Sequence, residues 1–154
     1  MILISHRGNI NGKNEELENN PEYIDVALNL GYDVEIDIRY HQEQLWLGHD
    51  GPYYQIDIEW LLKRSDKLWI HCKNESAVEY FTENDYLTKD LNWFWHEEDT
   101  LTLTSFGYVW VYPGKQPIKN SIAVMPELKN DDVSQCMGIC SCLLYTSDAA
   151  DDTP

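Results

Sequence analysis

The segment 33–38 constrains the fold of this chain most strongly, because apolar and acidic residues alternate along it. A period of two residues predicts a β-strand whose successive side chains point to opposite faces of a sheet. The apolar side chains then share one face, and Glu35 and Asp37 lie on the other, about 6–7 Å apart along the strand. Two neighbouring carboxylates repel each other and are costly to bury unpaired, so this face either meets water or holds a positive group.

Two further apolar runs end in polar groups of the kind found at active sites. His6, Arg7 and Gly8 follow the apolar run 2–5, and His49 and Asp50 follow the run 45–47. Three strand-like segments therefore end in side chains that can bind a metal, move a proton or hold a phosphate. A half-buried antiparallel strand with a wet acidic face is the simpler interpretation of segment 33–38 alone, and the neighbouring motifs count against it.

The order of the expected elements predicts an α/β fold of barrel type. A helix separates the strands 2–5 and 33–38, and this unit implies a parallel pair. The apolar stripe of this helix is expected to comprise Tyr23, Val26, Ala27 and Leu30. Further strands are expected at 45–47, 67–73, 92–96, 107–112, 121–125 and 137–140, and further helices at 58–62 and 75–81.

Polar residues recur at the carboxyl ends of these strands, which is typical of a parallel (β/α) barrel. The 154 residues of the chain fall well below the ~250 residues usual for that fold. We therefore expect one domain, a reduced or incomplete TIM-type (β/α) barrel from which several outer helices are missing.

The formal net charge of −16 narrows the range of partners. It disfavours nucleic acids and anionic membrane surfaces, and it disfavours an anionic substrate unless local cations, such as a divalent metal ion, attract it. No apolar run approaches the length of a membrane helix. Met1 leads directly into an apolar run without a basic region or a cleavage site. We expect no nucleic-acid partner, no stable membrane insertion, no signal peptide and a cytoplasmic location.

The cysteines and the tail do not enter the expected site. Cys136, Cys140 and Cys142 have a spacing that matches no common zinc motif. The sequence from Cys142 onward resembles the in-frame translation of a transposon-type sequencing adapter. On this interpretation residues 1–141 form the domain, and residues 142–154 are a non-native, disordered tail that is excluded from fold reasoning.

Four short motifs of the first half of the chain form an ordered set: His6-Arg7-Gly8, Glu18-Asn19, Glu35-x-Asp37 and Gly48-His49-Asp50. In order and spacing they resemble the N-terminal half of the glycerophosphodiester phosphodiesterase family, which is grouped with the phosphatidylinositol-specific phospholipase C-like barrels. The resemblance covers about residues 1–75. Where the family has Glu-x-Lys on its third strand, this chain has His71-Cys72-Lys73, so an imidazole replaces one carboxylate.

The resemblance implies a metal-dependent phosphodiesterase that hydrolyses glycerophosphodiesters or similar small phosphodiesters. Glu35, Asp37 and His71 would hold a divalent metal ion, taken from Mg²⁺, Mn²⁺, Ca²⁺ and Zn²⁺. Two carboxylates with one imidazole suit Mn²⁺ or Zn²⁺ better than Ca²⁺. A small phosphodiester is then the expected partner, whereas the oligomeric state stays open.

The same resemblance implies acid–base catalysis by two histidines. His6 and His49 would act as general base and general acid, because imidazole titrates near neutral pH. Arg7 and Lys73 would bind phosphate oxygens, Arg7 bidentately. The remaining candidates for substrate binding are Glu18, Asn19 and His96.

Other interpretations of the same residues stay open. A lyase of the same barrel group would form a cyclic phosphate with similar chemistry, and a degenerate barrel would only bind a phosphorylated metabolite or a partner. Arg7 could pair structurally with Glu35 or Asp37, Glu18 could be a solvated loop charge, and Lys73 could be a structural counter-charge. The aromatic excess near the later strands favours filling of the core, and it comprises Trp93, Trp95, Trp110 and Tyr112.

Overall fold

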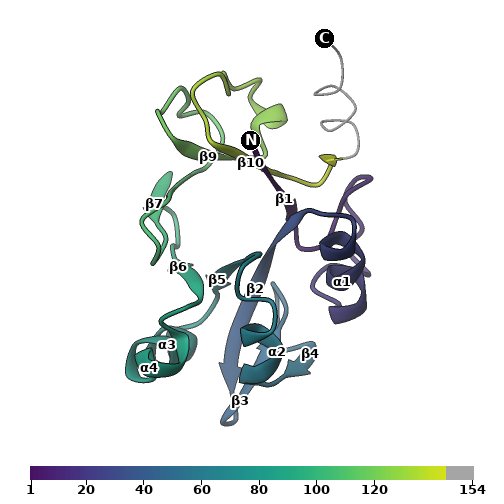
Figure 1. Cartoon of the computed structure of the whole chain (residues 1–154), viewed down its shortest axis with the longest axis vertical. Coiled ribbons are helices and arrows are strands. Elements are labelled where there is room, and N and C mark those ends of the chain that lie inside the picture. Colours follow the sequence, from purple (N-terminus) through teal and green to yellow (C-terminus); the bar gives the residue numbers. More distant parts are fainter. Residues whose placement is uncertain (145–154) are drawn as a thin grey trace.

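A ten-stranded mixed sheet, curled around an inner core, organises the chain (Figure 1). The computed structural model describes residues 1–144, so residues 145–154 of the predicted tail lie outside the described part. In chain order, the elements are β1 (Ile2–His6), α1 (Pro21–Asn29), β2 (Asp33–His41), β3 (Gln44–Leu47), β4 (Tyr54–Ile56), α2 (Ile58–Leu62), β5 (Leu68–Cys72), α3 (Glu75–Glu83), α4 (Asp85–Thr88), β6 (Asn92–Trp95), β7 (Leu101–Leu103), β8 (Val109–Val111), β9 (Ser121–Val124), the 3-10 helix η1 (Pro126–Leu128) and β10 (Gly138–Ser141).

Neighbouring strands run parallel through most of the sheet, in the spatial order β6, β5, β2, β1, β10, β9, β8. The parallel pairing of β1 with β2 across α1 confirms the predicted strand–helix–strand unit. Antiparallel partners are added by β3 and β4 at the end of β2, and by β7 beside β8. Figure 1 shows the strands following a curve, with β7 on the side between β6 and β9.

The prediction of a reduced TIM-type (β/α) barrel is wrong, because helices do not alternate with strands through the described chain. Among the described connections, only those that precede β6 contain α-helices. The chain passes from β6 to β8 through the antiparallel strand β7, and from β8 to β9 through a loop. Pro113, Gly114 and Pro117 in that loop oppose a helix, since proline lacks the backbone donor and glycine is a poor helix former. The result is a curled mixed sheet with few short helices.

Two apolar clusters lie on the two faces of the sheet. Val34, Ile36 and Ile38 of β2 point outward and pack with the helices of the first half, as the alternation predicts. On the inner face, Trp69, Phe94 and Trp110 fill the curve together with smaller side chains of β1, β9 and β10. Burial of each large apolar side chain contributes roughly 1.5–3 kcal/mol. The inner cluster therefore closes the space beneath the site described below.

Asparagine and aspartate side chains cap the longer helices of the first half. The side chain of Asn20 accepts from the backbone N–H of Glu22 at the start of α1, and Asn74 does the same for α3. The predicted stripe of α1 is only partly correct. Ile24 and Ala27 are buried. Val26 and Leu30, which belong to the predicted stripe, are 54% and 60% exposed.

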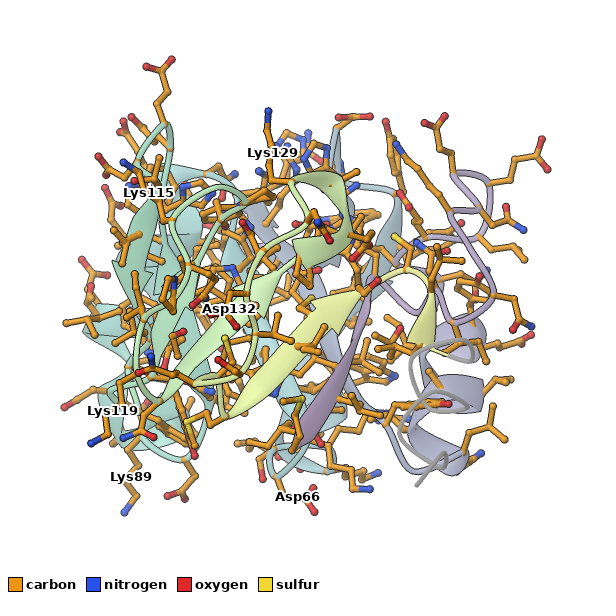
Figure 2. All side chains as sticks on the ribbon, turned by 90° about the horizontal axis from the view of Figure 1, so that it is seen from above. Asp66, Lys89, Lys115, Lys119, Lys129 and Asp132 are labelled. Atoms are coloured by element: carbon orange, nitrogen blue, oxygen red, sulfur yellow. The ribbon has the colours of Figure 1, made fainter. Side chains whose placement is uncertain are left out.

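The carboxyl ends of the parallel strands meet at one edge of the sheet. In Figure 2, Lys115 and Lys129, which follow β8 and β9, lie toward the upper edge. Asp66, Lys89 and Lys119, which precede β5, β6 and β9, lie at the lower edge. His6 ends β1 and His71 lies next to the end of β5, and the strand register places Glu35 and Asp37 of β2 beside these two histidines. Among the described helices, none is long and apolar enough to cross a membrane.

Candidate active site

A cavity of about 230 Å³ opens where the parallel strands end. Strands on both sides of β2 contribute to its wall, because β1, β5, β6 and β8 all end near it. Most of the predicted site residues line this one cavity, namely His6, Arg7, Glu35, His49, His71, Lys73 and His96. Segments up to 90 residues apart in the sequence thus supply one site.

The strand register brings the three predicted metal ligands together. Asp37 of β2 is the direct neighbour of His71 on β5, and Glu35 lies two residues earlier on the same face. His71 Nδ1 lies 3.6 Å from Asp37 Oδ1 and 3.9 Å from Glu35 Oε2. One ligand atom from each of the three residues lies within 4.8 Å of the others. This donor set is compact enough to surround one cation.

Burial makes it unfavourable for Glu35 and Asp37 to be charged at the same time. Glu35 and Asp37 are 2% and 0% exposed. Desolvation, followed by repulsion from Asp37, raises the pKa of Glu35 well above its ordinary value. Glu35 Oε1 and Asp37 Oδ1 have no hydrogen-bond partner among the described residues. A buried oxygen of this kind needs a proton or a cation, and a divalent metal ion would satisfy both oxygens together.

Asn19 fixes the orientation of the Asp37 carboxylate. Its Nδ2 donates to Asp37 Oδ2 at 2.8 Å, and its Oδ1 accepts from the backbone N–H of Asp37 at 2.9 Å. Asn19 adopts a left-handed conformation with φ of 66°, which asparagine tolerates better than most residues. It lies in the wall of a neighbouring cavity rather than in that of the main one. Its contacts make it a support for Asp37.

Arg7 is held by two carboxylates at once. Its Nε lies 3.0 Å from Asp37 Oδ2, and its Nη1 donates to Glu18 Oε1 at 3.2 Å. The other Glu18 oxygen accepts from Asn9 Nδ2 at 2.7 Å, and Tyr23 donates its hydroxyl to Asn9 Oδ1. Burial opposes the charge of Arg7, but the three nearby carboxylates outweigh it and raise the Arg7 pKa. The structural ion pair considered for Arg7 therefore exists, and Glu18 belongs to it.

His6 is positioned as a neutral imidazole. Its Nε2 lies 3.8 Å from Glu35 Oε1, and its Nδ1 lies 3.5 Å from the Cys142 sulfur. Burial and the charge of Arg7 lower the pKa of His6 to about 3. A buried imidazole of this kind accepts a proton only when chemistry supplies one at close range. Cys142, although part of the predicted tail, is itself buried beside this histidine.

His49 lines the cavity from the loop that follows β3. Gly48 has a φ of 153°, and a Cβ there would meet the Gly51 carbonyl, so glycine is required for this turn. Arg39 of β2 donates to the carbonyl groups of both Gly48 and His49. His49 Nδ1 lies 2.7 Å from Asp50 Oδ1. This contact favours the Nδ1–H tautomer and leaves Nε2 for the cavity.

A run of neighbouring rings extends from the candidate metal ligand His71 along the cavity wall. His96 lies 5.0 Å from His71, and Tyr112 lies 4.1 Å from His96, measured between ring centroids. Burial, followed by the charge of Lys73, lowers the pKa of His71 to about 2, and the same two causes lower the pKa of His96. The imidazoles are thus neutral, which is the form that binds a metal.

Sequence reasoning did not identify Asn9 or Tyr112 as site residues. Asn9 lies in a polar loop with four further asparagines, so composition alone does not distinguish it. Tyr112 belongs to the alternating segment Trp110-Val111-Tyr112, and that pattern was assigned to core filling. The prediction is correct for Trp110, which is 1% exposed in the inner cluster. The signal for Tyr112 was its place at the end of a strand, immediately before Pro113.

A second cavity, of about 500 Å³, adjoins the first through Arg7 and His49, which line both. Its remaining wall is acidic and aromatic and includes Glu15, Glu16, Tyr53 and Tyr54.

Comparison of the chain with models of protein families, with curated proteins and with solved structures found no match. The geometry of the two cavities therefore carries the functional conclusion.

Proposed function

We propose that the chain is a metal-dependent phosphodiesterase that hydrolyses a glycerophosphodiester or a similar small phosphodiester. One observation carries this proposal. A buried donor set of two carboxylates and one imidazole, Glu35, Asp37 and His71, lies in the same cavity region as three further histidines and two cations. Acid, base, metal ligands and anion-binding groups within one small cavity are the components of metal-assisted phosphoryl transfer.

The donor set fits a divalent cation. The two buried carboxylate oxygens, Glu35 Oε1 and Asp37 Oδ1, have no hydrogen-bond partner among the described residues, and the His71 imidazole is neutral. Asn19 and Arg7 engage the other Asp37 oxygen, so that Oδ1 faces the donor set. A cation bound there supplies positive charge to phosphate oxygens and stabilises the charge that develops in the transition state.

His6 has the properties of the general base. Its lowered pKa keeps the imidazole unprotonated at neutral pH, so the ring is in the form that can accept a proton. The proton comes from a water molecule, or from a hydroxyl group next to the phosphodiester, as the new bond to phosphorus forms. Contact with Glu35 on one side and Cys142 on the other fixes the ring.

His49 has the properties of the general acid. Its side chain is 39% exposed, and the 2.7 Å contact of its Nδ1 with Asp50 Oδ1 orients the ring. The proton on Nε2 passes to the oxygen of the leaving alcohol as the phosphorus–oxygen bond breaks. Arg7 and Lys73, which line the same cavity, bind the phosphate oxygens. The ion pairs of Arg7 use Nε and Nη1 and leave Nη2 for this contact.

The test is turnover of the full chain on glycerophosphocholine and on bis(p-nitrophenyl) phosphate. Each substrate is assayed with Mg²⁺, Mn²⁺, Ca²⁺ or Zn²⁺, and with a chelator. We expect activity that requires a metal ion and that falls by about 10²–10⁴-fold in His6→Ala. We also expect it to be lost in Glu35→Ala. The matched controls are His41→Ala and Glu43→Ala, whose side chains are exposed at the turn after β2.

The products and the controls decide between the alternatives. An open phosphomonoester indicates hydrolysis, whereas a cyclic phosphate indicates the lyase. A folded protein that shows no turnover with any of the four metals would contradict the phosphodiesterase and favour a binding protein. Equal loss of activity in the His41→Ala control would assign the effect of His6→Ala to general damage.

A further inference from the structure

We propose that Tyr112 is a further substrate-binding residue of this site, and that its phenol O–H donates a hydrogen bond to a phosphate oxygen. The proposal rests on the phosphodiesterase function above and deepens it. Tyr112 lies directly after β8 and lines the main cavity. Its backbone N–H donates to the Thr100 carbonyl at 2.9 Å, which fixes the residue to the segment that precedes β7.

The contact between Trp110 and Tyr112 determines the direction of the phenol proton. Trp110 Nε1 lies 3.2 Å from the Tyr112 hydroxyl oxygen. An indole N–H only donates, so the phenol oxygen is the acceptor in this hydrogen bond. The phenol proton must therefore point to another acceptor. This assignment follows from the chemistry of the two groups and does not depend on the placement of a hydrogen atom.

Trp110 is held too firmly to release this contact. It is 1% exposed, and its ring lies 4.8 Å from the Phe94 ring and 5.6 Å from the Trp69 ring, measured between centroids. On the other side, the His96 ring lies 4.1 Å from Tyr112. Tyr112 is thus clamped between a rigid donor and a neighbouring ring, and its O–H is a preorganised donor at the cavity wall.

A phosphate oxygen is the acceptor that suits this position. The cavity wall already contains the two cations Arg7 and Lys73, and a phosphodiester placed between them has oxygen lone pairs to spare. Burial raises the pKa of Tyr112, so the phenol keeps its proton. A neutral donor adds a directed contact without adding charge. This contact is expected to hold the phosphate group against the wall of the cavity that Tyr112 lines.

The test is the binding of inorganic phosphate to the full chain in the presence of Mg²⁺. Isothermal titration calorimetry gives the affinity for the wild type, for Tyr112→Phe and for Tyr108→Phe. Tyr108 is the matched control, because it points to the same face two residues before Trp110, packs on Trp69 and does not line this cavity. We expect Tyr112→Phe to bind phosphate about tenfold more weakly, and Tyr108→Phe to bind it like the wild type.

A second readout follows the indole N–H of Trp110 by nuclear magnetic resonance, with the signal assigned by its absence in Trp110→Phe. Phosphate is expected to shift this signal in the wild type and not in Tyr112→Phe. Phosphate affinity that is equal in the wild type and Tyr112→Phe would overturn the role of Tyr112 and leave the proposed function standing. A wild type that binds no phosphate would overturn both, and a lower melting temperature of Tyr112→Phe with unchanged affinity would assign Tyr112 a structural role only.

Discussion

His71 and Asp37 lie side by side in the register of two parallel strands, with His71 Nδ1 3.6 Å from Asp37 Oδ1. An imidazole therefore occupies a place at which a third carboxylate would make the buried cluster more negative. Glu35 already has a raised pKa because of burial and the Asp37 charge. In the proposed metal site, a neutral histidine would complete a three-ligand set without adding to this repulsion, and it would also bias the choice of metal.

The first prediction concerns that choice of metal. His71→Glu is expected to shift the preference toward Ca²⁺ and Mg²⁺ and away from Zn²⁺ and Mn²⁺, because hard cations favour oxygen ligands. Titration calorimetry of the wild type and the variant with each metal measures the shift, which we expect to be about tenfold in the ratio of affinities. His41→Glu, at an exposed position, is the control. An unchanged ratio would show that His71 is not a ligand.

The second prediction concerns the support of Asp37. Asn19→Gly removes both hydrogen bonds to Asp37, and it keeps the left-handed backbone, which glycine adopts readily. A buried polar group left without a partner costs about 1–3 kcal/mol, so we expect the free energy of unfolding to fall by at least this amount. Urea denaturation measures the change, with the exposed Asn29→Gly as a comparison. A loss no larger than that of Asn29→Gly would argue against the supporting role.

The strands and the carboxylate face could be predicted because they are local patterns. The alternation along β2 places Val34 and Ile36 outward and Glu35 inward, whatever the rest of the chain does. Strand ends could be recognised by the glycine and proline that follow them, and helix starts by Asn20 and Asp57. These features need only a few consecutive residues.

The curled mixed sheet and the hydrogen-bond network could not be predicted because they depend on distant contacts. The side of α1 that faces the core is one example. Ile24 and Ala27 are three residues apart and Val26 and Leu30 are four apart, so both pairs have a helical spacing. Packing on β2 selects between the two faces. Tyr112 is another, since the phenol becomes a site residue only when β8 comes to lie near the end of β6.

The third prediction concerns the turn after β1. Gly8 has a φ of 95°, and a Cβ there would lie 2.7 Å from Tyr23 Cδ2. Gly31 has a nearly equal φ of 97° with no atom within 4 Å of such a Cβ. Gly31→Ala should therefore lower the free energy of unfolding only by the strain of a left-handed alanine, roughly 1–2 kcal/mol. Gly8→Ala should cost more, because Tyr23 must move and its bond to Asn9 is disturbed. Equal losses in urea denaturation would show that the Tyr23 ring yields freely.

The last prediction concerns the stability of the metal-free protein at different pH values. The folded chain keeps His6 and His71 neutral, with pKa values lowered to about 3 and about 2, whereas the unfolded chain protonates both near pH 6.5. Below pH 6.5 the unfolded state thus binds more protons, so the free energy of unfolding falls as the pH falls. The raised pKa of Glu35 acts in the opposite direction above about pH 4.5, because the folded state then keeps a proton that the unfolded state has lost.

The two histidines have a larger effect than the one glutamate. We therefore expect the free energy of unfolding to rise with pH between about 4.5 and 6.5 when a chelator is present. The slope is at most about 1.4 kcal/mol per pH unit for each proton by which the unfolded and folded states differ. Urea denaturation at several pH values measures the slope. His6→Asn removes one of the two histidines that are protonated in this pH range only in the unfolded chain, so it should reduce the slope. His41→Asn at the exposed turn should leave the slope unchanged. A slope that is the same in His6→Asn would mean that His6 carries its proton in the folded chain, and the imidazole would then be unable to act as the base.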